Sequence, residues 1–315
     1  MTAKEQYRQL CETEGARIPL FQQYWWMEAV CEGKQWDVLL VRRDDGTVEG
    51  ALPYLHGSRF GLRYILQPEL TQYNGPWYNH PEGSTSAERI ALENRVGEAL
   101  AKQLEALRIN IFSQNFSPAV TNWLPFHWAS YHQTTRYTYR FPSIADPDAL
   151  ISQASGARRK NLSTLAGTCT VDTSTLTPET FARMHNGYWK RRSGNDLLTE
   201  DFVARVCTAA LERGQGLLWG LRNEEKLLCS AFVAYDERCA YALLSAANEE
   251  APANAQTYLD WQMIRHLSDR TQAFDFEGSM EPGGEFYYRS FGTEQTPYFH
   301  ITRCRPALLR HLIKL

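Results

Sequence analysis

Hydrophobic and polar positions follow two different periods along the 315-residue chain. Apolar residues at every third or fourth position predict amphipathic helices, and short apolar runs between turn residues predict strands. The clearest helical stripe runs from Leu92 to Leu107, and the Asp45-Gly46 pair predicts a hairpin between two strands. In the first half we expect helices at 21–31, 86–107 and 118–124, and strands at 36–43, 48–56, 64–66, 109–113 and 131–141.

The second half repeats this order of elements. We expect helices at 148–165, 177–192, 199–213 and 254–270, a short helix around 285–289 and a last helix from Pro306, with strands at 168–172, 216–222, 227–235, 240–246, 275–277 and 295–303. The similar order predicts a duplicated α/β unit of about 150 residues. The fold class is therefore α/β (α+β). It has two tandem units, 1–145 and 146–315, each with a mixed, mostly antiparallel sheet flanked by helices. The last strand or helix is expected to pack back on the first unit.

Composition removes several classes of function. The net charge of -3 provides no overall positive field to attract nucleic acid. The seven cysteines are odd in number and lack Cys-x-x-Cys spacing, which favours reduced thiols in a cytoplasmic protein over disulfides or structural zinc. The eight histidines show no metal-binding spacing, so no metal site is expected. We also expect no signal peptide and no membrane span.

The stretch 274–292 contains the densest set of chemically useful side chains. Phe274 and Phe276 alternate with Asp275 and Glu277, so on a strand the carboxylates share one face. A carboxylate partly removed from water can have a raised pKa suited to accepting a proton from an amine. Glu277 is therefore the candidate general base, with Asp275 as its orienting partner. The alternative is that Glu277 accepts hydrogen bonds from the turn at 278–280 or pairs with an arginine.

The short helix that follows supplies the other candidates of this stretch. Tyr287 is a candidate general acid toward a leaving thiolate or ribose oxygen, and Tyr288 and Arg289 are candidates for substrate binding. Glu285 and Arg289 are four residues apart, so a helix-surface ion pair explains them equally well.

Two basic runs suggest a site for a phosphate-rich ligand. Arg158, Arg159 and Lys160 are consecutive, so on a helix they spread over about 200° and do not form one patch. The second run, 190–192, lies at a predicted helix end, where it also complements the helix dipole. If both runs face one cleft, they bind CoA, tRNA or a lipid pyrophosphate.

Three segments carry a family resemblance: Phe274–Met280 with Tyr288–Gly292, Arg158–Leu162, and the Pro- and Gly-punctuated loop Gln67–Tyr78. With the order of elements, they resemble the tandem GNAT N-acyltransferases of the FemAB group and its BioF-like relatives, which are bacterial enzymes. The resemblance implies acyl or aminoacyl transfer from acyl-CoA or aminoacyl-tRNA to an amine acceptor, such as an amino sugar or a cell-wall precursor. Acyl-CoA would be a donor substrate, and no cofactor would be tightly bound.

One segment departs from the family pattern. The stretch 248–256 occupies the place of the glycine loop that holds the CoA pyrophosphate, yet it has no glycine and contains Pro252. The helix that begins after Asn254 can still attract an anion through its dipole. The implied donor-binding residues are Asn254, Gln256, Arg158, Arg159 and Lys160, and the further substrate-binding candidates are Tyr188, Trp189 and Tyr73. The alternative function is a non-catalytic ligand-binding or accessory protein that keeps the duplicated fold.

Overall fold

The chain forms two compact units in a computed structural model that describes residues 1–165, 167–194, 198–278 and 280–307. The first unit comprises Met1–Arg136 and the chain from Pro297 onward, and the second comprises Tyr137–Thr296. The chain enters the second unit within β6 (His132–Phe141) and returns within β12 (Glu294–Cys304). The first crossing lies before the expected boundary at 145/146, because residues of β6 pair with strand β11 (Ala273–Asp275) of the second unit.

The first unit is built on the sheet order β1-β2-β3-β5-β12, with β4 beside β2. Its pairs are antiparallel except β3–β5, which is parallel. The remaining elements are α1 (Ala3–Thr13), η1 (Gly15–Arg17), η2 (Leu20–Gln22), α2 (Tyr24–Val30), β1 (Gln35–Arg42), β2 (Val48–Arg59), β3 (Leu62–Leu66), β4 (Trp77–Tyr78), α3 (Ser86–Ala106), β5 (Ile111–Asn115) and α4 (Leu124–Trp128).

Helix α3 supplies the core of this unit with the predicted apolar stripe, of which Val96 and Leu100 are fully buried. Two helices differ from expectation. Helix α1 was not predicted, although Thr2 and Glu5 form a capping box at its start. The short helix expected at 118–124 lies at 124–128, because Pro125 favours the first turn of a helix over its interior.

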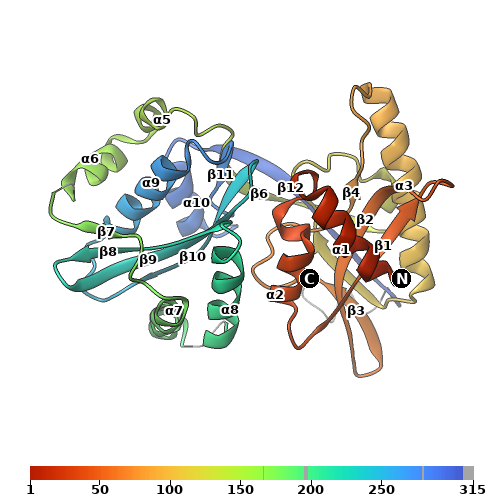
Figure 1. Ribbon diagram of the computed structural model, residues 1–315, viewed down its shortest axis with the longest axis horizontal. Coiled ribbons are helices and arrows are strands. Elements are labelled where there is room, and N and C mark those ends of the chain that lie inside the picture. Colours follow the sequence, from red (N-terminus) through yellow and green to blue (C-terminus); the bar gives the residue numbers. More distant parts are fainter. Residues whose placement is uncertain (166, 195–197, 279, 308–315) are drawn as a thin grey trace. The chain divides into compact units, whose positions relative to one another are not determined.

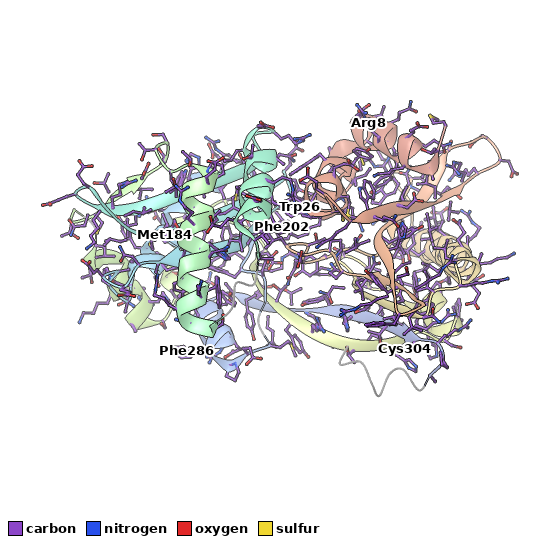
Figure 2. The ribbon with its side chains drawn as sticks, turned by 90° about the horizontal axis from the view of Figure 1, so that it is seen from below. Arg8, Trp26, Met184, Phe202, Phe286 and Cys304 are labelled. Atoms are coloured by element: carbon purple, nitrogen blue, oxygen red, sulfur yellow. The ribbon has the colours of Figure 1, made fainter. Side chains whose placement is uncertain are left out.

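The second unit has the sheet order β7-β8-β9-β10-β11-β6, antiparallel except for the parallel pair β10–β11. Helices α7 and α8 cover one face, and α9 with α5, α6 and α10 covers the other (Figure 1). Met184 on α7 and Phe202 on α8 mark the first of these faces in Figure 2. The elements are α5 (Pro147–Gln153), α6 (Gly156–Thr164), β7 (Thr170–Asp172), α7 (Pro178–Ser193), α8 (Glu200–Leu211), β8 (Gly216–Asn223), β9 (Lys226–Tyr235), β10 (Cys239–Ala247), α9 (Ala255–Leu267) and α10 (Pro282–Arg289).

The two units thus share one plan, which confirms the predicted fold class. Each has a mixed, mostly antiparallel sheet with a single parallel pair, and in each a long helix, α3 or α9, precedes the second strand of that pair. Ser279 lies outside the described residues, and so does most of the helix expected after Pro306. Within the described part of the chain, no helix is both long and apolar enough to cross a bilayer.

Candidate functional site

The site in the second unit begins where β11 ends. Phe274 and Phe276 turn into the core together, with ring centroids 5.0 Å apart. The strand expected to include Glu277 stops at Asp275, and Glu277 adopts a left-handed backbone with φ of 55°. Gly278 explains this departure: a Cβ there would lie 1.9 Å from the carbonyl oxygen of Tyr137, so the chain approaches β6 closely only with glycine at this position.

Asp275 anchors this turn from inside the protein. It is fully buried and accepts hydrogen bonds from the Thr138 hydroxyl and, at 2.8 Å, from the backbone N–H of Glu277. The Arg140 guanidinium lies 3.5 Å from its other oxygen. The Gly278 N–H donates to the Thr138 hydroxyl at 2.8 Å, so β6 holds both ends of the turn.

In the described part of the chain, the Glu277 carboxylate has an unsatisfied oxygen. Its Oε1 atom is buried and has no hydrogen-bond partner among the described residues. Burial, and then the nearby Asp275 carboxylate, raise the pKa of Glu277 well above its usual value. The described residues place no arginine in an ion pair with it, and the adjacent Gly278 N–H donates elsewhere.

Helices α9 and α10 bring a second carboxylate, Asp260, into a hydrogen-bonded chain. Gln256 donates to its Oδ1 at 2.7 Å, and the Tyr287 hydroxyl donates to its Oδ2 at 2.8 Å. Burial raises the pKa of Asp260 to about 6, although both donors and Arg158 act to lower it. Burial, and then Asp260, raise the pKa of Tyr287 well above its usual value, so its hydroxyl stays protonated at neutral pH.

Arg158 connects helix α6 to helices α9 and α10. Its Nε donates to the Ser290 hydroxyl at 3.0 Å, and its other nitrogens donate to the Thr257 hydroxyl and, at 3.3 Å, to the carbonyl of Tyr287. The guanidinium also lies over the Tyr287 ring, 4.5 Å from its centroid. Burial lowers the pKa of Arg158. A cation in this position favours negative charge on Tyr287 and Asp260.

The pKa of Tyr288 is raised by burial and by three nearby carboxylates. Burial raises its pKa to about 12, and Asp260, Glu277 and Asp275 each add to the rise. The ring packs against Phe276, with centroids 5.5 Å apart.

The remaining basic candidates point outward. Arg159 is exposed and donates to the carbonyl of Ser152 at 3.1 Å, and Lys160 is exposed on the same helix. The spread predicted for the first basic run is therefore observed, with Arg158 inside and its two neighbours outside. Arg289 is also exposed and pairs with Glu285 at 2.6 Å, as the alternative interpretation of that spacing predicted.

The aromatic substrate-binding candidates lie elsewhere. Tyr188 and Trp189 stack edge to face on α7, which covers the opposite face of the sheet from α9 and α10 (Figure 1). Tyr73 belongs to the first unit, where it is buried and packs against Tyr298 with centroids 5.1 Å apart.

The connection from β10 to α9 keeps its acidic residues paired. Glu249 lies 3.4 Å from Arg191, and Glu250 pairs with Lys226. Asn254 is the N-cap of α9, but its side chain donates to the carbonyl of Asn161 at 3.0 Å and accepts no N–H of the helix. No side chain of the described residues therefore caps the first-turn N–H groups of α9, so these groups are available to bind an anion.

Sequence reasoning missed Asp260, Thr257 and Thr138. Asp260 carried a usable signal, because it lies four residues after Gln256 inside an otherwise apolar helical stripe, where an unpaired carboxylate is costly. Thr138 carried none, because its contact with Asp275 spans 137 residues of sequence.

Comparisons with known proteins identify similar folds and a matching domain. Residues 152–289 match the family model of the acetyltransferase (GNAT) domain. Among solved structures, the chain is similar to FemX, with a TM-score of 0.72 and 13% identity over 100% of this chain and 99% of that one. It is also similar to L-PGS from Bacillus licheniformis, with a TM-score of 0.55 and 11% identity over 96% and 92% of the two chains.

A third similar structure is a tandem GNAT protein from the clavulanic acid biosynthesis pathway, solved without AcCoA. Its TM-score is 0.54, with 12% identity over 95% of this chain and 94% of that one. No curated protein matches the sequence. The protein thus shares its fold with FemX and with this tandem GNAT protein, and the match of residues 152–289 to the GNAT acetyltransferase domain supports an acyltransferase in general terms.

Proposed function

We propose that the second unit transfers an acyl group from acyl-CoA to the amine of a small acceptor, such as an amino sugar or a cell-wall precursor. Glu277 is the observation that carries the proposal. Its pKa is raised, and its Oε1 atom is buried without a hydrogen-bond partner among the described residues. Its left-handed backbone is a strained conformation, and such strain concentrates at functional sites.

In this proposal Glu277 is the general base. A primary amine is protonated at neutral pH and must lose a proton to become nucleophilic. The ammonium first gives one proton to solvent, and the Glu277 carboxylate accepts the second proton as the neutral amine nitrogen attacks the thioester carbonyl. The new C–N bond forms, the C–S bond breaks, and its electron pair leaves with the CoA sulfur.

Tyr287 then supplies the proton for the leaving thiolate. Its raised pKa keeps the hydroxyl protonated until the thiolate forms, and the chain from Gln256 through Asp260 holds the hydroxyl in place. Arg158, which lies over the Tyr287 ring, stabilises the negative charge that proton donation leaves behind. Thr257 and Ser290 in turn fix the guanidinium.

The donor phosphates are assigned to the N-terminus of α9, next to Asn254 and Gln256. The helix dipole and its uncapped first-turn N–H groups favour an anion there. Exposed Arg159 and Lys160 lie on α6, which packs against α9, and add positive charge to this region. The similar clavulanic acid pathway protein, whose description mentions AcCoA, supports the choice of donor. Tyr288 and Arg289 remain predicted substrate contacts. The proposed site does not include Tyr188 and Trp189, which lie on the opposite face of the sheet, or Tyr73, which belongs to the first unit.

The second candidate function is a binding protein that lacks catalysis. It is favoured by the connection from β10 to α9, which has no glycine and includes Pro252, a residue without an N–H to donate to phosphate. Folds persist after activities are lost, so the fold alone does not decide between the two functions.

Thermal unfolding with added ligands, followed by a thiol-release assay, separates the candidates. We expect acetyl-CoA at 100 times its Kd to stabilise the protein by about 2.7 kcal/mol, a shift of several degrees in Tm. We also expect CoA thiol to be released when amines such as glucosamine are added. Stabilisation by aminoacyl-tRNA and not by acetyl-CoA would show that aminoacyl-tRNA is the donor. Binding of amino sugars without any turnover would favour the non-catalytic binding protein.

A further inference from the structure

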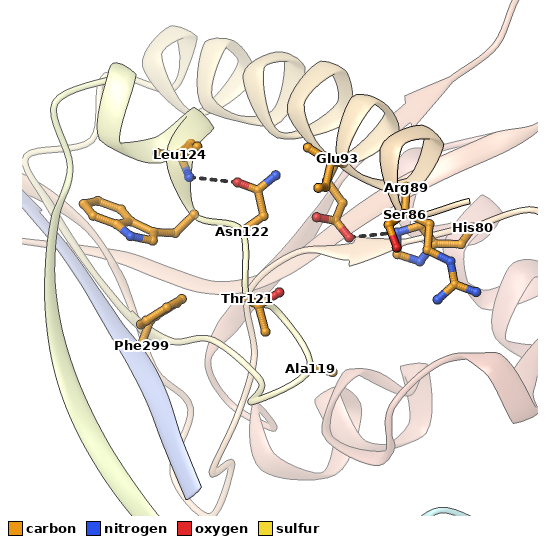
Figure 3. A pocket seen from close by; sticks show the side chains of 11 residues that line it. His80, Ser86, Arg89, Glu93, Ala119, Thr121, Asn122, Leu124 and Phe299 are labelled. Atoms are coloured by element: carbon orange, nitrogen blue, oxygen red, sulfur yellow. Dashed lines mark hydrogen bonds and ion pairs between the residues drawn. The ribbon is translucent and has the colours of Figure 1, made fainter. Parts of the chain in front are cut away.

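The first unit contains a pocket of its own, with a volume of about 830 Å³ (Figure 3). This volume lies in the range of small-molecule binding sites. The lining comes from five parts of the unit: the segment at residue 80, the N-terminal half of α3, the segment at 119–123, the first residue of α4, and β12. The lining residues are His80, Ser86, Arg89, Ile90, Glu93, Ala119, Thr121, Asn122, Trp123, Leu124 and Phe299.

One end of the pocket is apolar. The rings of Trp123 and Phe299 lie with centroids 6.5 Å apart. Ile90 and Leu124 also line the pocket, and they are 50% and 45% exposed. Large apolar side chains that are exposed together around a concave surface mark a place where a ligand or partner removes water. Planar rings in particular stack on aromatic side chains.

The other end carries a cation that has no anionic partner among the described residues. Figure 3 shows Arg89 beside Ser86 and His80, across the pocket from Phe299. Glu93 is the nearest carboxylate in the lining, and it contacts His80 at 2.9 Å instead. Arg89 and Ser86 lie in the first turns of α3, where the helix dipole adds positive potential. The Thr85 side chain already accepts the N–H of Glu88, so an anion would contact side chains at this end.

We propose that this pocket binds a small molecule with a planar apolar ring system and one anionic group. The ring would lie against Trp123 and Phe299, and the anion would lie against Arg89 and the Ser86 hydroxyl. The pocket shares no residue with the acyl-transfer site proposed in the second unit. Evidence for or against ligand binding in this pocket is therefore independent of the proposed acyl transfer.

The test uses 8-anilinonaphthalene-1-sulfonate, an aromatic anion, and N-phenyl-1-naphthylamine, a closely related neutral probe. We expect saturable binding of the sulfonate to the full chain. The substitution Arg89→Ala should weaken sulfonate binding about tenfold, as loss of one charge-assisted hydrogen bond does, and should leave binding of the neutral probe unchanged. Lys102→Ala, which removes an exposed cation farther along α3, is the matched control and should change neither affinity.

A second substitution keeps the proposal testable if Arg89→Ala does not fold. Ile90 is half exposed, so Ile90→Glu should leave the fold intact while repelling the sulfonate. We expect it to weaken sulfonate binding more than binding of the neutral probe. The proposal fails if the sulfonate does not bind. It also fails if Arg89→Ala and Ile90→Glu bind the sulfonate as tightly as the unsubstituted protein does.

Discussion

Asp260 and Glu277, two carboxylates of the second unit whose pKa values are raised, differ in their surroundings. Asp260 accepts hydrogen bonds from Gln256 and Tyr287, so both of its oxygens are occupied. The Oε1 atom of Glu277 has no partner among the described residues. A saturated carboxylate suits a positioning role, whereas one with an unused lone pair suits proton transfer. This contrast supports the proposed roles, in which Asp260 holds Tyr287 and Glu277 acts as the base.

The pKa of Asp260 predicts a pH-dependent component of stability. Its folded-state pKa is about 6 and its ordinary value is 3.8, so the folded protein binds this proton more tightly than the unfolded chain does. The resulting stabilisation is complete below the unfolded-state value and is lost as the pH rises through about 6. It amounts to about 3 kcal/mol. We expect Asp260→Asn to lack this component in urea unfolding measured from about pH 4 to about pH 7.

Asp269→Asn is the control for this measurement, because the Asp269 side chain is 83% exposed. It should follow the pH dependence of the unsubstituted protein. If Asp260→Asn also followed that curve, the carboxylate would not carry a raised pKa, and its assigned role in holding Tyr287 would lose its electrostatic basis.

At the scale of elements, the turn between β11 and α10 sets the position of Glu277. A Cβ at Gly278 would overlap the carbonyl of Tyr137, whereas a Cβ at Gly283, in the first turn of α10, meets nothing within 4 Å. We expect Gly278→Ala to lower the free energy of unfolding by about 1–3 kcal/mol, as overpacking does. Gly283→Ala should be neutral or stabilise by up to about 1 kcal/mol, because alanine favours helix.

Urea unfolding of these two variants checks the prediction. Equal stabilities of the two alanine variants would show that the turn tolerates a side chain at position 278. The close approach of the chain to β6 would then not be what places Glu277.

Local sequence patterns predicted the long elements of both units. The apolar stripe of α3 and the strands β8, β9 and β10 lie close to their expected positions, since helical and strand periodicity are local properties. The last strand or helix was expected to pack back on the first unit, and β12 pairs with β5 there. The pattern did not predict that β6 ends in the second unit, because strand pairing depends on distant partners. The contacts of Arg158 with Ser290 and of Thr138 with Asp275 could not be predicted for the same reason, because each joins residues far apart in the sequence.

At the scale of the whole molecule, the site extends beyond the matched GNAT domain. The match at 152–289 contains Arg158, Asp260, Glu277 and Tyr287. It excludes Thr138 on β6, which holds both Asp275 and the Gly278 N–H. Thr138 belongs to the second unit, which begins at Tyr137, so the turn that carries Glu277 is held by a strand of its own unit that lies before the matched region.

The pH dependence of single-turnover CoA thiol release, compared between the unsubstituted protein and Glu277→Gln, tests the role of Glu277 most directly. Glutamine keeps the shape of the side chain and removes its ability to accept a proton. Because burial raises the pKa of Glu277, the rate should increase with pH until the carboxylate is ionised. Glu277→Gln should be about a hundredfold slower and lack that increase. Glu294→Gln, at an exposed carboxylate of the same unit, should keep the full rate. A Glu277→Gln variant with an unchanged rate and pH dependence would remove Glu277 as the general base.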